Sequence, residues 1–211
     1  MNETGSVRFS CDQVRANISS FTGFGELNRI RRKLIDLGMV GIDANGIGFG
    51  NLSVRDGASL GFYITGSGTG GIADLTAADF SRVVSHDFSR NWLRCKGARI
   101  ASSESLTHAA VYESDPDARA VIHVHDLKLW NALLKKKNVP ATPHGIAYGT
   151  PEMAQAVQRL FQITDVKDRK IFVMTAHDGG LVTFGRTITG AFDTLSFQVL
   201  NTSTSHLMSD L

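Results

Sequence analysis

Hydrophobic positions recur along this chain at helical spacing in three stretches. The first comprises Leu27, Ile30, Leu34 and Leu37. Gly38 follows it, so we expect a helix that ends there. A second stretch occupies residues 151–161, behind Thr150 as N-cap and a proline at the first helical position. We expect residues 187–207 to close the chain as a third helix.

Short runs of β-prone and apolar residues between these helices predict strands. Residues 50–64 have the pattern of a hairpin and are followed by a glycine-rich loop. Residues 118–125 and 170–177 are apolar runs that end in histidine, and we expect two buried strands there. Residues 179–185 can pair with the second of these strands across a turn. The combination of helical spacing and strand-like runs predicts an α/β fold.

Three further segments have weaker patterns. Residues 1–21 are polar and show no clear period, so we expect an irregular leader ahead of a single domain over residues 22–211. Thr76 and Asp79 have the spacing of an acidic capping box, which predicts a helix beginning at Thr76. A short helix is expected over residues 104–114.

Composition narrows the class of protein. A chain of 211 residues that is 42% hydrophobic can bury one good core. Its net charge of +2 comes without a basic stripe or acidic tail, so neither nucleic acid nor a membrane surface is expected as a partner. There is no apolar run of about 18 residues. Cys11 and Cys95 form no Cys-x-x-Cys motif, so we expect a cytoplasmic protein with reduced thiols.

The clearest candidate for chemistry is the His-Val-His sequence at the end of the first buried strand. His123 and His125 stand at i and i+2, so their side chains leave the same face and can converge on one ion. The alternative is a pair of strand-end histidines with ordinary hydrogen bonds. His177 ends the other strand and supplies a third nitrogen if the two strands are neighbours. Three imidazoles leave an open coordination position, which is typical of catalytic zinc.

Glu104 and the glycine-rich loop are candidates for binding or moving charge. Glu104 follows Ser102 and Ser103 at a helix start, where backbone N–H groups favour anions and the serine hydroxyls can donate. The alternative is a carboxylate that merely suits the positive end of a helix. Residues 66–71 match Gly-x-Gly-x-x-Gly, but no helix opens at once on the loop, which excludes the dinucleotide fingerprint. The loop suits a single phosphate or carboxylate, or forms a plain turn.

Taken in chain order, these motifs resemble the class II aldolase/adducin family, which includes fuculose-1-phosphate aldolase and ribulose-5-phosphate 4-epimerase. The motifs are Gly-Asn-Leu-Ser-Val-Arg at residues 50–55, Thr65-Gly66, Ser102-Ser103-Glu104, His123-Val124-His125 and His177. The resemblance runs from about residue 24 to 205. It implies a three-layer α/β/α sandwich around a mainly antiparallel sheet, assembled as a homotetramer with active sites between subunits.

The resemblance also implies roles for individual residues. The metal ligands are His123, His125 and His177, and the metal is zinc, with manganese or another divalent ion as alternatives. The residues around the substrate phosphate are Asn51, Thr65, Gly66, Ser102 and Ser103. Glu104 is the acid/base and, in some members, a fourth metal ligand.

The chemistry implied is that of a metal-dependent lyase. A metal that chelates a carbonyl and its neighbouring hydroxyl stabilises an enediolate, and a carboxylate can move the proton. We therefore expect retro-aldol cleavage, or dehydration or epimerisation, of a small phosphorylated ketose or related hydroxycarbonyl compound. The competing expectation is an adducin-like binding or assembly module that keeps the fold without the chemistry.

Three positions depart from the family's sugar-phosphate aldolases. Gly48 stands where they commonly have a threonine that grips phosphate. Asp178 separates His177 from the glycine that usually follows directly. Residues 140–150 form a shorter segment than theirs and lack the glycine-rich, tyrosine-bearing stretch that reaches a neighbouring site. No catalytic tyrosine is therefore carried over.

Overall fold

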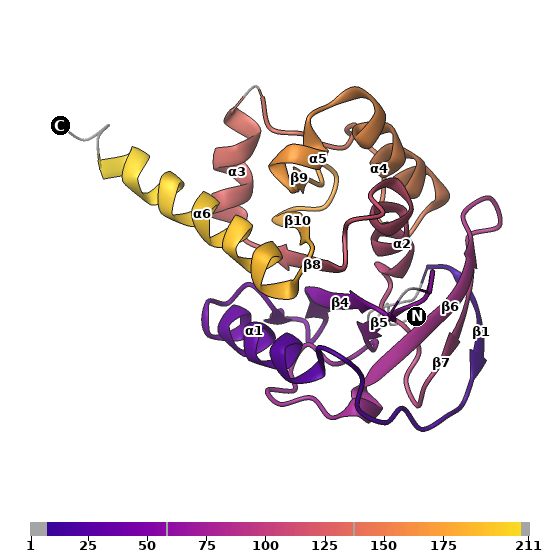
Figure 1. Ribbon diagram of the computed structural model, residues 1–211. Helices are drawn as coiled ribbons and strands as arrows, with labels where there is room; N and C mark the ends of the chain where they lie inside the picture. The colour runs from indigo at the N-terminus through magenta and orange to yellow at the C-terminus, as the bar shows by residue number, and fades with distance from the viewer. Residues whose placement is uncertain (1–7, 58, 137, 208–211) are drawn as a thin grey trace.

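An eight-stranded sheet forms the centre of the molecule (Figure 1). The computed structural model describes residues 8–57, 59–136 and 138–207, with side chains to residue 202. In spatial order the strands are β1 (Ser10–Val14), β7 (Trp92–Lys96), β6 (Phe80–Asp87), β5 (Phe62–Thr65), β4 (Asn51–Arg55), β8 (Ala120–His125), β10 (Gly180–Gly185) and β9 (Ile171–Val173). Every neighbouring pair is antiparallel except β1 with β7. A small second sheet pairs β2 (Gly41–Ile42) with β3 (Gly48–Phe49).

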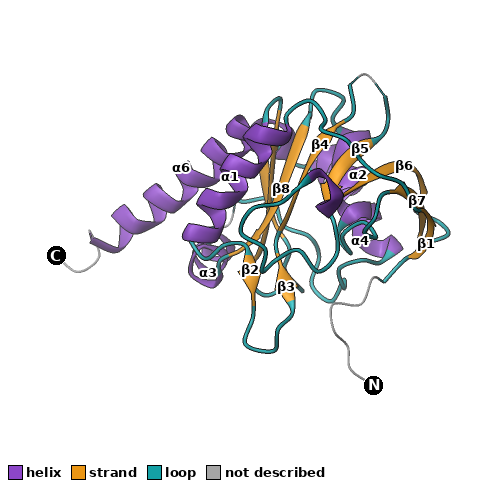
Figure 2. Ribbon diagram, turned by 90° about the horizontal axis from the view of Figure 1, so that it is seen from below, coloured by secondary structure: helices purple, strands orange, loops and turns teal. Residues whose placement is uncertain are grey.

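Helices cover both faces of this sheet (Figure 2). One face carries α1 (Phe24–Asp36), α3 (Leu127–Lys135) and α6 (Ile188–Leu207). The other carries α2 (Ser105–Ser114), α4 (Pro151–Ile163) and the short α5 (Val166–Arg169). Each face has its own buried apolar cluster, and the expected three-layer α/β/α sandwich is confirmed. Within the described residues, no helix combines the length and apolar character needed to cross a membrane.

The central strand β8 shows how the sheet divides its side chains. Ile122 and Val124 pack into the cluster under α1, α3 and α6, whereas Val121 packs into the cluster under α2 and α4. Successive strand residues point to opposite faces. His123 and His125 therefore lie on the α2 side, and the expected common face is confirmed.

The expectation of an irregular leader over residues 1–21 is wrong for residues 10–14. These residues form β1, which pairs in parallel with β7. Its side chains alternate between exposed and half-buried positions, so main-chain hydrogen bonds rather than apolar burial hold the strand. Phe9, only 7% exposed, anchors its start in the core. A polar edge strand of this kind has no hydrophobic period to reveal it.

The helix expected from Thr76 is a single 3₁₀ turn, η1 (Ala77–Asp79). The capping box does form, since the Thr76 N–H donates to the Asp79 carboxylate over 2.9 Å. The next residues enter β6, which pairs with β5 and β7. The local cap signal was correct, but pairing with distant strands decides the conformation that follows it.

The two cysteines are unbonded but adjacent in space. The Sγ atoms of Cys11 on β1 and Cys95 on β7 lie 3.3 Å apart. Their separation along the chain gave no indication of this contact, because it depends on the unexpected pairing of β1 with β7.

Candidate metal centre and active site

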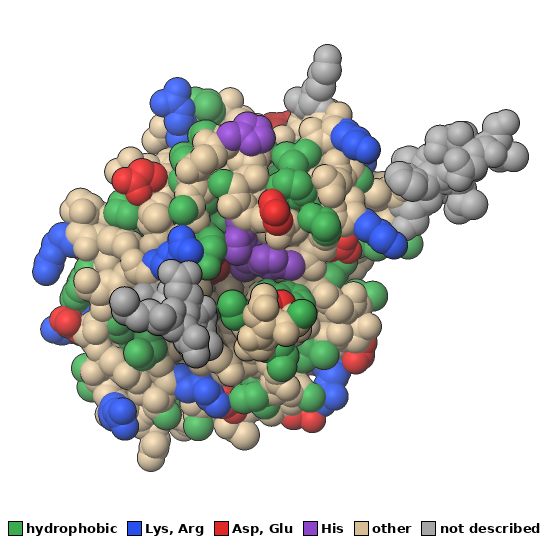
Figure 3. All heavy atoms as spheres, turned by 180° about the vertical axis from the view of Figure 1, so that it is seen from behind, with side chains coloured by type: hydrophobic (Ala, Val, Ile, Leu, Met, Phe, Trp, Pro, Cys, Tyr) green, Lys and Arg blue, Asp and Glu red, His purple; other side chains and the backbone are tan. Residues whose placement is uncertain are grey.

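Three histidine side chains converge at one end of the central strands. His123 and His125 come from β8, and their Nε2 atoms lie 3.2 Å apart. His177 comes from the turn between β9 and β10, and one nitrogen from each of the three rings lies within 4.8 Å of the others. Figure 3 shows histidine side chains grouped near the centre of this face. The spacing suits one metal ion bound by all three.

Hydrogen bonds on the outer side of the rings fix their orientation. His123 Nδ1 donates to the Leu181 carbonyl oxygen over 3.1 Å, which leaves Nε2 as the nitrogen that faces the cluster. The backbone of Asp178 acts on the His125 ring in the direction that favours its protonated form. Donation from the second ring nitrogen to a carbonyl is the usual support for a metal-binding histidine. The donor set therefore fits a divalent ion.

Burial keeps the three imidazoles neutral. It lowers the pKa of His123 well below its ordinary value and that of His177 to about 3, and the neighbouring imidazoles add to both shifts. The pKa of His125 is also lowered by burial. A neutral ring has a free lone pair, which is the form that binds a metal ion. Near neutral pH the cluster is ready to act as a ligand set.

His177 reaches the cluster from a turn rather than from a strand end. The strand expected over residues 170–177 ends at Val173, because the chain then leaves the sheet: the Thr175 hydroxyl donates to the Thr142 carbonyl oxygen over 2.9 Å. Within the turn, a Cβ at Gly180 would lie 2.8 Å from His177, so only glycine leaves room for this ring. The predicted pairing of residues 179–185 with the preceding strand is confirmed.

Glu104 lies at the start of α2 with a carboxylate that is nearly inaccessible. The residue is 2% exposed, and its Oε2 accepts a hydrogen bond from the Thr107 hydroxyl over 2.7 Å. Its Oε1 lies 3.9 Å from His177 Nε2 and has no hydrogen-bond partner among the described residues. Burial raises the pKa of Glu104 to about 7, against the effect of the Thr107 hydrogen bond. A buried carboxylate oxygen without a hydrogen bond, in a cavity that the three imidazoles also line, fits a site for a cation.

The expectation that serine hydroxyls donate to the Glu104 carboxylate is wrong. Ser102 Oγ instead accepts from the Glu104 backbone N–H at 3.5 Å, the local i to i+2 bond of a serine turn. Thr107, one helical turn into α2, takes the donor role. Its i+3 spacing from Glu104 is the sequence signal for this bond.

A polar cup adjoins the histidine cluster. Its lining residues are Gly46, Ile47, Gly48, Gly50, Asn51, Thr65, Gly66, Ser67, Gly68, Thr69, Gly70, Ser102 and Ser103. The cavity at the histidines shares Asn51 and Ser103 with this cup, so the two form one continuous cleft. All five residues expected around the phosphate line the cup. Asn51 Oδ1 is buried without a hydrogen-bond partner among the described residues.

The backbone N–H groups of the glycine-rich loop that are free to bind an anion lie C-terminal to Gly66. The Gly66 and Ser67 N–H groups donate to backbone carbonyls, each over 2.8 Å, and the Thr65 hydroxyl accepts from the Leu52 N–H. The backbone N–H groups of residues 68–70 have no acceptor among the described residues. Ser67 also lines the cup and was missed, although a serine inside a glycine-rich loop was a usable signal.

Arg31 supports the glycine-rich loop from within the protein. It is 2% exposed, and its guanidinium donates to the carbonyl oxygens of Thr69 and Ile72 over 2.6 Å each, and to those of Gly70 and Ala73 over 3.3 Å. No carboxylate among the described residues lies within ion-pair distance of it. Burial lowers the pKa of Arg31 to about 10, so it stays charged. The sequence signal was an arginine between the apolar positions of the first helix.

The expectation that residues 140–150 lack a tyrosine-bearing stretch is wrong, because the segment contains Tyr148, which lies in the cleft. Its ring centroid lies 4.3 Å from that of His177, and it lines the cavity at the histidines. The shortened segment over residues 140–150 thus supplies an aromatic side chain from the same subunit. Nothing local distinguished Tyr148, because its importance depends on the position of the turn that carries His177.

An α/β/α sandwich with three converging histidines and a buried carboxylate defines an aldolase-like fold with a candidate metal site. The chain belongs to the class II aldolase and adducin family. The family described as "Class II Aldolase and Adducin N-terminal domain" matches residues 29–198. No curated protein matches the sequence of this chain.

Solved structures of this fold cover most of the chain. An L-fuculose 1-phosphate aldolase has a TM-score of 0.68 at 21% identity, over 92% of this chain and 89% of that one. YgbL from Escherichia coli, titled a putative aldolase/epimerase/decarboxylase, has a TM-score of 0.66 at 20% identity, over 88% of each chain. A sugar-phosphate aldolase from Thermotoga maritima has a TM-score of 0.65 at 15% identity, over 88% of this chain and 94% of that one. At these identities the likeness shows a shared fold.

Proposed function

We propose that this chain is a metal-dependent lyase that cleaves a small phosphorylated ketose or related hydroxycarbonyl compound by a retro-aldol reaction. Dehydration or epimerisation is open to the same residues. One observation carries the proposal: the unpartnered carboxylate oxygen of Glu104 faces three neutral imidazoles, 3.9 Å from His177 Nε2. A binding module that had lost the chemistry has no need for that costly buried carboxylate.

The three histidines would hold a divalent ion, which we propose to be zinc. When bound, such an ion polarises a substrate carbonyl. Glu104 takes and returns the substrate proton at Oε1, while Thr107 holds the other oxygen in place. Its pKa of about 7 in the metal-free chain is raised by burial, and a neighbouring cation lowers it again. A carboxylate in this range can both accept and donate a proton near neutral pH.

The cup would bind the substrate phosphate through neutral donors. Ser102, Ser103 and Asn51 line it together with the N–H groups of residues 68–70. No lysine or arginine of the described residues lines the cup, so these dipoles and the buried charge of Arg31 behind the loop favour the anion. The shared lining at Asn51 and Ser103 supports a phosphate bound next to the reacting carbons.

The test is a panel of ketose 1-phosphates and their unphosphorylated sugars, assayed with and without a chelator. We expect turnover of a phosphorylated substrate, loss of that turnover with chelator and recovery on adding zinc. Turnover of a free sugar as efficient as that of its phosphate would contradict the phosphate role of the cup. Absence of metal from protein prepared under zinc-replete conditions would favour an adducin-like module instead.

Removal of one imidazole should lower the metal content. We expect His177→Ala to bind zinc much more weakly than the unchanged protein, because only two imidazole ligands remain. Elemental analysis after dialysis against trace chelator measures the content. His144→Ala is the matched control, since His144 is an exposed loop residue outside the cluster. Full zinc content in His177→Ala would mean that the third ligand is another residue.

The protein should assemble as a homotetramer. The family relationship suggests it, and α6 carries exposed apolar side chains at Phe197 and Leu200. Light scattering on the purified protein should give about four times the chain mass of 22.8 kDa. A monomer at micromolar concentration would remove the basis for an active site shared between subunits. A cytoplasmic location stays a prediction.

A further inference from the structure

Arg8, Tyr148 and His177 follow one another at the end of the cleft away from the cup. The Arg8 guanidinium carbon lies 4.1 Å from the Tyr148 ring centroid, which lies 4.3 Å from that of His177, with the two rings tilted by 43°. Tyr148 and His177 line the cavity at the histidines but not the cup. The cleft therefore has a cup of neutral donors at one end, and Arg8 lies against Tyr148, a residue that lines the other end.

Arg8 comes from a part of the chain that the family match does not include. The match begins at residue 29, whereas Arg8 lies two residues before β1, the strand that pairs in parallel with β7. The Asn91 side-chain amide donates to the Arg8 carbonyl oxygen over 2.7 Å, and the Ser10 N–H donates to the Asn91 carbonyl oxygen over 2.8 Å. These bonds fix the Arg8 backbone beside Gly149 and so aim the side chain before any ligand arrives.

The Arg8 charge has no counter-ion in the described part of the chain. No carboxylate there lies within ion-pair distance of it. Its field nevertheless reaches the site, because it lowers the pKa of both Glu104 and His177. Stacking on an aromatic face occupies the plane of a guanidinium and leaves its N–H edge free. That edge matches a carboxylate, which can accept two parallel hydrogen bonds.

We propose that Arg8 binds a carboxylate at the end of the substrate opposite its phosphate. This inference rests on the proposed function and narrows its substrate to a phosphorylated hydroxy or oxo acid rather than a neutral sugar phosphate. Tyr148 is the platform that positions the guanidinium. A carboxylate is preferred over a second phosphate because the cup already provides the phosphate site and the guanidinium fork matches carboxylate geometry.

The test uses two probes that differ only at this end of the molecule. They are 4-phosphoerythronate, which has a carboxylate, and erythritol 4-phosphate, which has a hydroxymethyl group in its place. Calorimetry with the zinc-loaded, full-length protein should show that the acid binds about tenfold more tightly or better, as expected for a charge-assisted pair. Arg8→Ala should remove this preference and leave the affinity for erythritol 4-phosphate unchanged. Arg8→Lys should keep part of it.

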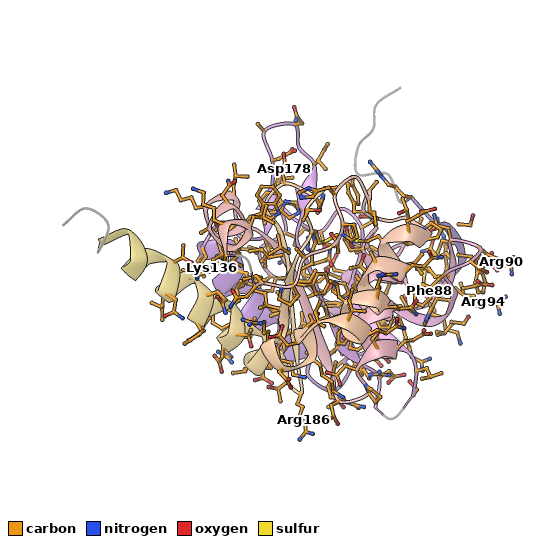
Figure 4. All side chains as sticks on the ribbon, turned by 90° about the horizontal axis from the view of Figure 1, so that it is seen from above. Phe88, Arg90, Arg94, Lys136, Asp178 and Arg186 are labelled. Carbon is orange, nitrogen blue, oxygen red and sulfur yellow. The ribbon has the colours of Figure 1, made fainter. Side chains whose placement is uncertain are left out.

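Arg94→Ala is the matched control, because it removes the same charge from another exposed arginine close to β1. Arg94 lies on β7 and pairs with Asp12 of β1 at 3.6 Å, but it projects at the edge of the molecule, far from Asp178 (Figure 4). We expect it to keep the full preference for the acid. Circular dichroism should report native folding for both alanine variants, since Arg8 and Arg94 are exposed.

The outcomes separate this inference from the proposed function. Equal binding of the two probes by the unchanged protein would overturn the role of Arg8 and leave the lyase proposal standing. An Arg8→Ala variant that keeps the preference for the acid would do the same. If neither probe binds, both proposals fall. Loss of the preference in Arg94→Ala would mean that the effect is one of net charge rather than contact.

Discussion

Replacing Glu104 by glutamine should lower kcat by about 10² to 10⁴, because the amide keeps the shape of the carboxylate but cannot accept the substrate proton. The fold and most of the metal should remain, since the three histidines are untouched. Turnover and zinc content have to be measured on the same preparation. Glu113→Gln is the matched control, a change of the same kind on the same helix at an exposed position.

The two measurements separate the possible roles of Glu104. A large loss of zinc in Glu104→Gln would make the carboxylate chiefly a metal ligand. Unchanged turnover would refute the proposed proton transfer. Only a loss of turnover with zinc retained supports the acid/base role.

The same substitution should stabilise the metal-free protein at alkaline pH. Burial raises the pKa of Glu104 to about 7 from an ordinary 4.5, so the native state holds this proton more tightly than the unfolded state. Stability therefore falls as pH rises through this interval, and the full cost is present above pH 7. Urea unfolding at pH 5 and pH 8 should show that the stability advantage of Glu104→Gln over the unchanged protein is small at pH 5 and reaches about 3 kcal/mol at pH 8. Equal stability at both values would indicate that the carboxylate is better solvated than the structure suggests.

Arg31→Met should destabilise the protein by about 3 kcal/mol, because buried carbonyl oxygens of residues 69–73 lose the donors that satisfy them. The methionine fills much of the same volume, so the loss reports hydrogen bonds more than a cavity. Denaturant unfolding measures it. Arg29→Met, on the exposed face of the same helix, should change stability by less than about 0.5 kcal/mol.

Catalysis provides a second measurement on the Arg31 variant. If Arg31 holds the loop so that its N–H groups face the cup, Arg31→Met should raise KM for a phosphorylated substrate more than it lowers kcat. A stable variant with unchanged KM would show that the loop keeps its shape without the guanidinium.

The elements that the sequence predicts best are those stabilised by burial of their own side chains. The apolar spacing of α1 and the run of β8 are such signals, because each pattern matches the face that the element buries. The strand β1 and the end of η1 could not be predicted, since main-chain pairing with distant strands determines both. The same limit applies to Cys11 and Cys95, which meet only through that pairing.

The candidate site divides in the same way. His123 and His125 could be predicted together because one strand fixes their common face. His177 was predicted as a ligand from its expected place at a strand end, and the structure places it in the cluster from a turn instead. Arg8 and Tyr148 have no local signal, since only the folded chain stacks them beside His177. Arg31 had a local signal, because it is a charged residue among the apolar positions of its helix. That signal does not reveal which carbonyl oxygens it binds.

Because side chains alternate along β8, the histidine cluster can form only when β8 pairs with its neighbours in the native register. His123 lies opposite Asn51 of β4 and Val182 of β10. A slip of one residue would turn both histidines of β8 into the apolar layer beneath α6 and bring Ile122 and Val124 to the cleft. Such a misaligned chain could not assemble the ligand set. Zinc added during refolding should therefore raise the yield of correctly aligned protein, because it binds and stabilises that alignment alone.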